Sequence, residues 1–414
     1  MTIPAPETSI GASYDPFGAQ LDDPYSFYAK ARREEPVFYS SVFQAWVITR
    51  YEDVRHVLMH PEVFSSANAI RPVAATFTPN CVAELKRGYP MTRGLINTDG
   101  AAHERLRAPF LKALGKKHVR RLEPFIREQV DALVDAMLPA ENAELMHQFV
   151  HPLPFRVLAH LLGIDEPDYE HMYEVSRAAS RIFRAGNLTP DEQVVAARLM
   201  VDLHHTVVSY ARARRTDPRD DLITAVVAEL APGDAPLTFE QESDLAWCLP
   251  GVIGSTNSLE AILGTGIYYL LVNHDQWTAL VARPNLIDSA IEEICRFDPP
   301  AQTFARITTQ PVTLNGVDLP KDTEVMVMFG SANRDEALVD PPEEFDITRP
   351  RMHHLTFGQG SHLCLGAPVV RAVLRIMLET FIRRMPRLRI IDGQPVPFAP
   401  SLNHRQPTRL PVTW

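Results

Sequence analysis

The spacing of apolar residues predicts a mainly helical chain with a smaller β-containing part. Apolar residues recur at three- and four-residue steps, as in amphipathic helices, over residues 24–34, 51–59, 118–235 and 370–382. Alternating or β-branched runs predict strands at 37–39, 45–49 and 324–329, a hairpin at Asn315-Gly316, and short strands near the C-terminus.

The longest helix is predicted at 238–273. Thr238 and Gln241 form a capping-box pattern at its start, and the helical pattern continues to about Asn273. Such a helix is on the order of 50 Å long, and only a large core can bury it. Pro250 lacks the N–H that continues the hydrogen-bond ladder, so we expect a kink there.

Three stretches have a weaker pattern. Residues 1–20 are rich in proline and glycine and predict an irregular N-terminal segment. Residues 62–98 have little periodicity, and an irregular stretch of this length usually serves a function. Within 173–195 we expect a helix–turn–helix junction, with Thr189 as the N-cap and Pro190 in the first turn of the second helix.

The composition fits a large globular protein and limits its partners. Of the 414 residues 45% are hydrophobic and 22% charged, which is enough to bury a sizeable core. The net charge of −10 argues against nucleic acid as a partner. We find no long apolar run, no signal-like N-terminus and no CxxC pair among the four cysteines, so we expect a cytoplasmic protein without a membrane anchor.

One cysteine, Cys364, lies in a glycine-rich loop at residues 357–366, directly before the helix predicted at 370–382. A helix N-terminus lowers a thiol pKa and stabilises the thiolate. Three interpretations follow: a nucleophile with His362 as its base, a metal ligand, or an inert buried cysteine. The glycine spacing makes the inert cysteine the weakest of the three.

The pattern Phe-x-x-Gly-x-x-x-Cys-x-Gly, at Phe357, Gly360, Cys364 and Gly366, resembles the heme-binding loop of the cytochrome P450 family. The resemblance implies the P450 fold as a single heme domain over residues 1–414, with heme b between the 238–273 helix and the loop. It makes Cys364 the axial iron ligand, and it places Phe357, Gly358, His362 and Gly366 around the cofactor.

Two further groups of residues follow from the same resemblance. His103 and Arg107 are one turn apart, and by spacing alone they would be an ordinary solvated helix face. The resemblance instead assigns them, with Arg306, to the heme propionates. It also assigns Glu293, Arg296 and Arg349 to a buried structural triad behind the heme loop.

The distal helix departs from the family motif. The register places Gly254-Ser255-Thr256-Asn257-Ser258-Leu259 on the small-Gly-x-acid-Thr-Thr sequence, so Asn257 replaces the acid and Ser258 the key threonine. Protons for dioxygen cleavage are normally relayed by an alcohol and an acid, and an amide cannot titrate. We therefore expect a monooxygenase with an altered relay, with Ser258 and Asn257 at its centre. Three alternatives stay open: a group of the substrate helps to deliver the protons, water alone delivers them, or the reaction is not plain hydroxylation. In the last case the enzyme would be peroxide-dependent, oxidative-coupling or isomerising. A non-catalytic heme sensor is a weaker alternative.

The resemblance also predicts the partners. An apolar substrate would contact Ile253, Gly254, Leu259, Phe304 and Leu402, with 62–98 and 173–195 as access regions. Terpenoids, fatty acids, aromatics and polyketide-like molecules all fit this lining. Electrons would come from NAD(P)H through a reductase and a ferredoxin. The acidic ferredoxin would bind a local basic cluster: Lys112, Lys116, Lys117, Arg120 and Arg121. The protein itself is expected to be a monomer.

Overall fold

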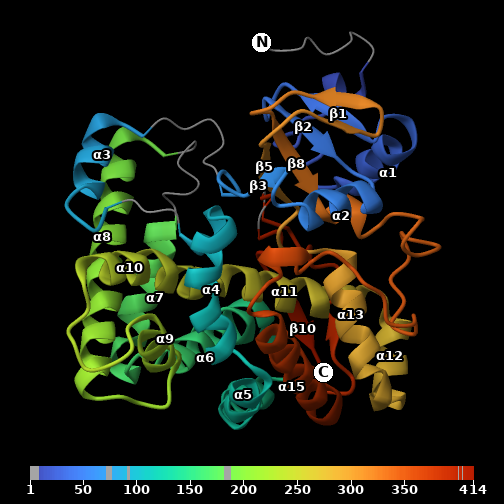
Figure 1. Ribbon diagram of the computed structural model, residues 1–414. Coiled ribbons are helices and arrows are strands. Elements are labelled where there is room, and N and C mark those ends of the chain that lie inside the picture. The colour runs from blue at the N-terminus through green and yellow to red at the C-terminus, as the bar shows by residue number, and fades with distance from the viewer. Residues whose placement is uncertain (1–8, 71–76, 91–93, 181–187, 400, 403) are drawn as a thin grey trace. The chain divides into compact units, whose positions relative to one another are not determined.

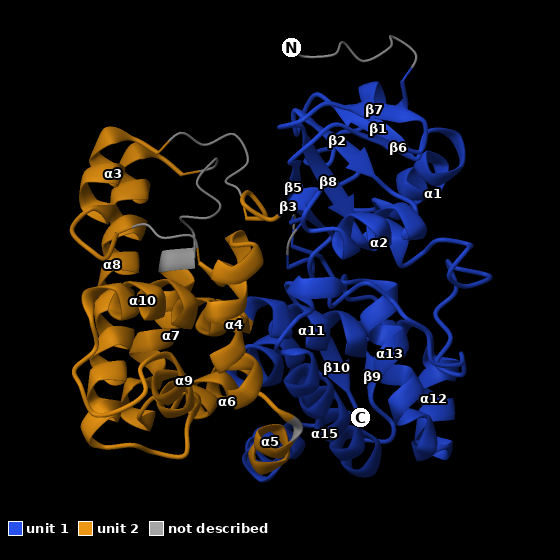
Figure 2. Cartoon of the chain, viewed as in Figure 1, with its two compact units in different colours: residues 1–65, 123–153, 257–414 blue, residues 66–122, 154–256 orange. Residues whose placement is uncertain are grey.

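The computed structural model describes residues 9–70, 77–90, 94–180, 188–399, 401–402 and 404–414 (Figure 1). The chain forms two units, each made of separate stretches of sequence (Figure 2). Unit 1 comprises residues 1–65, 123–153 and 257–414, and unit 2 comprises 66–122 and 154–256. Among the described residues, no helix is both long and apolar enough to span a membrane.

Unit 1 contains all the described strands. Their bounds are β1 (Val37–Ser40), β2 (Ala45–Ile48), β3 (Phe64–Ser65), β4 (Asn142–Glu144), β5 (Thr303–Thr308), β6 (Val312–Leu314), β7 (Val317–Leu319), β8 (Glu324–Met328), β9 (Arg389–Ile390) and β10 (Pro411–Thr413). The larger sheet has the order β1-β2-β8-β5-β3, in which only the β2–β8 pair is parallel. A smaller sheet has the order β4-β10-β9, and β6 and β7 form a hairpin.

Helices make up the rest of unit 1. They are α1 (Tyr25–Glu34), α2 (Tyr51–Met59), α11 (Thr256–Val272), α12 (His274–Ala282), α13 (Ile287–Phe297), α14 (Phe329–Ala332) and α15 (Ala367–Arg384), with short helices η1 (Ile10–Ser13), η3 (Leu138–Ala140), η4 (Met146–Val150), η7 (Pro284–Leu286) and η8 (Gly360–His362). The apolar face of α2, with Val54 and Val57, packs on the larger sheet around Val325 and Val327 and forms one continuous core.

The described part of unit 2 is helical. It contains α3 (Pro79–Leu85), η2 (Leu95–Asn97), α4 (Gly100–Ala113), η5 (Glu166–Asp168), α7 (Tyr169–Ser180), α8 (Pro190–Thr216), α9 (Leu222–Leu230) and α10 (Phe239–Gly254), while α5 (Lys116–Met137) and α6 (Pro152–Leu162) each cross a boundary between the units. Helix α8 is the centre of this unit, because α3, α7, α9 and α10 all pack against it.

Most predicted elements form where the pattern placed them. Thr189 caps α8 and Thr238 caps α10, each in a full capping box. The hairpin at Asn315-Gly316 is present, and both residues have positive φ, as its turn requires. The predictions for residues 1–8, 71–76, 91–93, 181–187 and 403 lie outside the described residues.

Two predictions need correction. The single helix at 238–273 is divided at Ser255 into α10 and α11. The Ser255 N–H is shared between the carbonyls of Gly251 and Val252, both 3.2 Å away, and the Ser255 hydroxyl also donates to the Gly251 carbonyl, 2.9 Å away. Such back-bonding by serine bends helices, and here it follows Pro250 by little more than one turn. Residues 62–98 are not wholly irregular either, since Thr78 caps α3 by accepting a hydrogen bond from the Cys81 N–H.

His204, on α8, is a buried histidine that no pattern predicted. Only 1% of it is exposed, and within the described chain neither ring nitrogen has a hydrogen-bond partner. Its ring packs on Trp247 of α10, with centroids 4.5 Å apart. Burial, together with the charge of His205, lowers the pKa of His204 from 6.5 to about 4.

We expect this histidine to make stability fall in mild acid. Between pH 6.5 and about 4 the unfolded chain binds a proton at His204 that the folded chain does not, so the stability present above pH 6.5 is lost as the pH falls. A shift of this size corresponds to roughly 3 kcal/mol. Urea unfolding at pH 7.5 and 4.5 should show a smaller acid loss in His204→Leu than in the wild type. His171→Leu, which removes an exposed histidine elsewhere in unit 2, is the control, and equal acid losses in the two variants would contradict the expectation.

Candidate active site

The loop around Cys364 is a tight turn that presents the thiol at the start of α15. Gly358 and Gly360 have φ of 68° and 73°, and a Cβ on Gly360 would come within 2.6 Å of the Leu58 carbonyl oxygen, so glycine is required there. The Cys364 N–H donates to the Phe357 carbonyl, 2.8 Å away, and closes the turn. A side chain on Gly366 would begin 3.8 Å from the Cys364 sulfur.

The four cysteines differ in their environments. Cys364 is exposed, whereas Cys81, Cys248 and Cys295 are buried. Burial raises the pKa of all three buried thiols, that of Cys248 to about 12. A ligand thiolate must be accessible and must ionise, so Cys364 is the cysteine suited to bind a metal. The inert buried cysteine, one of the three interpretations of the sequence, does not match its exposure.

Phe357 rests on an ion-pair cluster that the sequence analysis missed. The guanidinium of Arg371, on α15, lies 4.6 Å from the centre of the Phe357 ring and binds both carboxylate oxygens of Glu292, 2.6 and 2.9 Å away. His354 lies 3.3 Å from the same carboxylate. Burial opposes ionisation, but the bonds from Arg371 and His354 outweigh it and hold the pKa of Glu292 well below its usual range.

Glu293, Arg296 and Arg349 meet as the resemblance implied. Arg296 is fully buried and makes two hydrogen bonds to Glu293, at 2.7 and 2.8 Å. The Nε of Arg349 lies 3.5 Å from the Glu293 carboxylate. Arg296 also donates to the carbonyls of three residues between α14 and the Cys364 loop, namely Asn333, Pro342 and Glu344. The triad therefore fastens α13 to the segment that leads into the loop.

The other expected heme contacts divide between the units. Arg306, on β5 in unit 1, is buried and donates to the carbonyl of Ala305, 2.7 Å away. His103 and Arg107 share one face of α4 in unit 2, where His103 is 2% exposed and Arg107 half-buried. The spacing-only interpretation, a solvated helix face, is wrong for His103, because His103 is buried on α4 together with Leu106 and Phe110. Burial and the Arg107 charge lower the pKa of His103.

The first turn of α11 carries the two residues at the altered motif. Asn257 and Ser258 are both half-buried, and Leu259 is buried. Of the other expected pocket residues, Ile253 and Gly254 end α10 in unit 2. In unit 1, the carbonyl of Leu402 accepts a hydrogen bond from the Gln302 N–H.

Phe304 is also in unit 1, where it is half-buried on β5 and packs against the core of the larger sheet. Its ring meets that of Phe329 edge-on, with centroids 5.9 Å apart. Part of its surface is therefore used in packing the sheet, which leaves less of it for a substrate.

The predicted basic cluster is partly neutralised. Lys112 pairs with Glu229, and Arg121 pairs with Asp220 at 3.0 Å. Lys117 and Arg120 are exposed, and the side chain of Lys116 lies outside the description. The cluster is thus a mixed surface, with fewer open cations than the sequence alone indicates.

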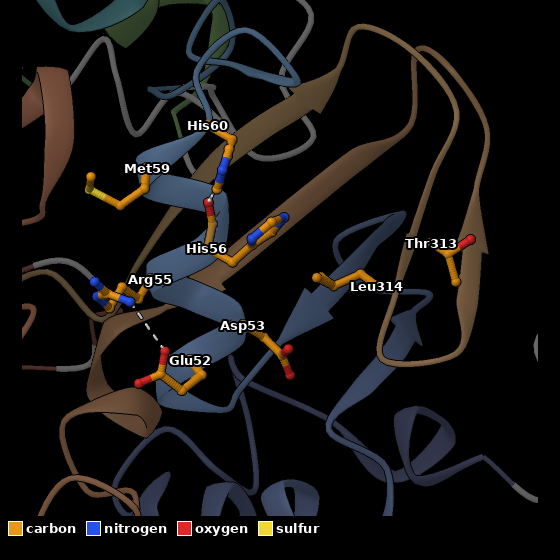
Figure 3. Close-up of a pocket in the computed structure, with 8 residues that line it drawn as sticks. All are labelled: Glu52, Asp53, Arg55, His56, Met59, His60, Thr313 and Leu314. Carbon is orange, nitrogen blue, oxygen red and sulfur yellow. Dashed lines mark hydrogen bonds and ion pairs between the residues drawn. The ribbon is translucent and has the colours of Figure 1, made fainter.

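A separate concavity of about 580 Å³ lies on unit 1, between α2 and the β6–β7 hairpin (Figure 3). Its lining includes His56 and His60, whose ring centroids are 4.2 Å apart, and His60 Nδ1 donates to the His56 carbonyl, 2.7 Å away. The residues that the resemblance assigns to heme or substrate are not among those that line it. It is therefore distinct from the candidate active site.

The residues of the candidate site fit a heme. An exposed thiol in a glycine-rich turn suits an iron ligand, and the cations Arg306 and Arg107, with the imidazole of His103 as a further donor, suit carboxylate groups. Cys364 and the turn that presents it come entirely from unit 1, so their geometry does not depend on unit 2.

Comparison with known proteins gives consistent matches. The family model described as Cytochrome P450 matches residues 273–402. The cytochrome P450 monooxygenase PikC of Streptomyces venezuelae is 31% identical and covers 100% of this chain and 95% of that protein. Mycinamicin IV hydroxylase/epoxidase of Micromonospora griseorubida is 31% identical and covers 90% of each chain. The P450 heme domain of Tepidiphilus thermophilus has a TM-score of 0.87 and 30% identity, covering 97% of this chain and 96% of that one. The predicted fold, mainly helical with small sheets in a single domain, is confirmed.

Proposed function

This chain belongs to the cytochrome P450 family of monooxygenases, and we propose that it hydroxylates or epoxidises a mainly apolar small molecule with electrons from NAD(P)H. The observation that carries the proposal is the exposed Cys364 thiol in its glycine turn at the start of α15. The printed activity of the mycinamicin relative, hydroxylation and epoxidation, supports the reaction type.

In this proposal the chain holds heme b through residues of distinct roles. Cys364 would supply the thiolate ligand to the iron, and Arg306, His103 and Arg107 would bind the propionate carboxylates. The turn residues Phe357, Gly358, His362 and Gly366 shape the cradle on the cysteine side. When bound, heme supplies the activation of dioxygen, which a thiolate ligand favours.

The remaining residues prepare the site for that chemistry. The ion pairs of Arg371 and Arg296 hold Phe357 and the approach to the loop in place. Ser258 offers a hydroxyl that can accept and donate a proton, and Asn257 offers an amide that can orient water but cannot titrate. Ile253, Gly254, Leu259, Phe304 and Leu402 would contact an apolar substrate, with 62–98 and 173–195 giving access to it.

Electron delivery completes the proposal. A cytoplasmic ferredoxin and its reductase would bring the electrons, and Lys117 and Arg120 are the exposed cations of the predicted cluster that an acidic partner could use. Attraction of this kind raises the association rate and is weakened by salt.

A second candidate function follows from Asn257 and Ser258: a heme-thiolate enzyme that uses peroxide, couples two radicals or isomerises its substrate. Turnover in isotopically labelled dioxygen separates the two functions. The protein would be supplied with NADH, a surrogate ferredoxin and reductase, and a substrate chosen by spectral titration of terpenoids, fatty acids, aromatics and macrolactones. We expect one labelled oxygen atom in each product molecule. Product without the label would favour the second candidate and contradict the first.

A further inference from the structure

Although Asn257 cannot titrate, the start of α11 does contain a carboxylate. Glu260 is three residues further along the helix and only 3% exposed. Residues three apart on an α-helix are neighbours on one face, so Glu260 lies beside Asn257, one turn along α11. Because this buried carboxylate lies beside the position that lacks an acid, Glu260 is a candidate for the role of that acid.

Glu260 has a titratable partner. The Nδ1 of His151 lies 3.1 Å from a Glu260 carboxylate oxygen, and both residues belong to unit 1. The Glu260 side chain is 4% exposed and that of His151 is 21% exposed. Because a buried carboxylate without a hydrogen-bonding partner is costly, this contact satisfies one of the Glu260 oxygens and connects it to a side chain that can carry a proton.

A second histidine connects His151 to the protein surface. The ring of His147 lies 5.2 Å from that of His151, and its side chain is 74% exposed and 4.0 Å from Glu144. Both histidines belong to the segment around η4, a π-helix, whose wider turn ends as the His151 N–H donates to the Met146 carbonyl. π-Helical turns recur at functional sites. Exposure thus falls from His147 through His151 to Glu260, along a line of groups that can each carry a proton.

We propose that Glu260, reloaded through His151 and His147, supplies protons to the Ser258 end of α11 in place of the acid that is absent at position 257. The inference rests on the proposed function. The proton leaves Nδ1 of the His151 imidazolium and joins the carboxylate of Glu260, which leaves both groups neutral. Glu260 then passes it through water oriented by the Asn257 amide to the Ser258 hydroxyl, and His151 regains a proton from His147 and solvent.

The first test is Glu260→Gln, which keeps the shape and a hydrogen-bonding side chain but removes the titratable group. Dioxygen-driven product formation should fall on the order of 100-fold, the usual contribution of a positioned acid. Product formation driven by hydrogen peroxide should stay near the wild-type rate, because peroxide brings its own protons. Glu379→Gln makes the same charge change in a half-exposed pair with Arg127, so it is the matched control and should leave both rates unchanged.

Rescue then tests the position of the acid. Adding Asn257→Asp to Glu260→Gln puts a carboxylate back one turn earlier on the same face of α11, and dioxygen-driven turnover should recover at least 10-fold, a part of what an acid contributes. If Glu260→Gln does not fold, His151→Gln removes the donor instead and should give the same loss with peroxide-driven turnover kept.

A readout independent of activity is the imidazole resonance of His151, followed by nuclear magnetic resonance in histidine-labelled holoenzyme. Loss of the carboxylate oxygen 3.1 Å from Nδ1 should shift this resonance in Glu260→Gln, and the resonance should stay in place in Glu379→Gln. An unchanged resonance, wild-type dioxygen-driven turnover in Glu260→Gln, or an equal loss of peroxide-driven turnover would overturn the relay. Failure of the proposed function would instead appear in the wild type, as product without label from dioxygen.

Discussion

Replacing Cys364 with alanine should abolish the heme-thiolate absorption spectrum and reduce dioxygen-driven product formation to the background of the assay. The thiol is the exposed one of the four, and glycine at 366 places no side chain beside the sulfur, where a Cβ would lie 3.8 Å away. Only another soft, anionic ligand could replace the thiolate in the spectrum. The nearby His362, two residues away, is neither soft nor anionic. The spectrum of the variant, compared with that of the wild type during a substrate titration, measures the loss directly.

Cys248→Ala is the matched control for this change. Cys248 is buried, with a pKa raised to about 12, and belongs to unit 2. The control should keep the thiolate spectrum and the spectral response to substrate, at a modest cost in stability for the small cavity. If Cys364→Ala kept the thiolate spectrum, or if Cys248→Ala lost it, the prediction that Cys364 is the iron ligand would be wrong.

Turns and helix caps that depend on residues a few positions apart could be predicted from the sequence. The Cys364 turn depends on glycines within a few residues of it, and the caps at Thr189 and Thr238 each need only the next turn of helix. Arg349 was within reach although it is 56 residues from Glu293, because the family pattern supplied what spacing could not. Local rules fail at Ser255, since a serine inside a helical pattern is compatible with either a continued or a divided helix.

Contacts between distant segments could not be predicted in this way. His151 and Glu260 are 109 residues apart, and Glu292 meets Arg371 across 79 residues, so no spacing connects them. The pairing of two members of the basic cluster could not be predicted for the same reason, because the acids that bind Lys112 and Arg121 lie about a hundred residues further along the chain. Charge counted along the sequence is thus a poor guide to charge on the surface, where folding brings opposite charges together.

Arg296→Met should be the most destabilising of the substitutions considered. It leaves Glu293, which is 1% exposed, without its two closest donors, and it leaves the carbonyls of Asn333 and Pro342 without their bonds from Arg296. The Glu344 carbonyl loses one of two donors and keeps the bond from Arg349, at 3.3 Å. Breaking one side of a buried ion pair costs about 3–5 kcal/mol. Arg296→Lys should recover little of this, because an ammonium cannot reproduce a planar, bidentate donor. Urea unfolding monitored by far-ultraviolet circular dichroism measures the change.

The matched control is Arg375→Met, which breaks the exposed pair between Arg375 and Asp288 and should cost less than about 1 kcal/mol. The double variant Glu293→Leu/Arg296→Met then separates two effects. If the penalty came only from the charge left on Glu293, removing that charge would restore stability. We expect recovery to be partial, because the carbonyls of Asn333 and Pro342 still lack their bonds from Arg296, and the Asp346 N–H loses its bond to Glu293. Full recovery would mean that Arg296 acts on Glu293 alone and does not fasten α13 to the segment before the Cys364 loop.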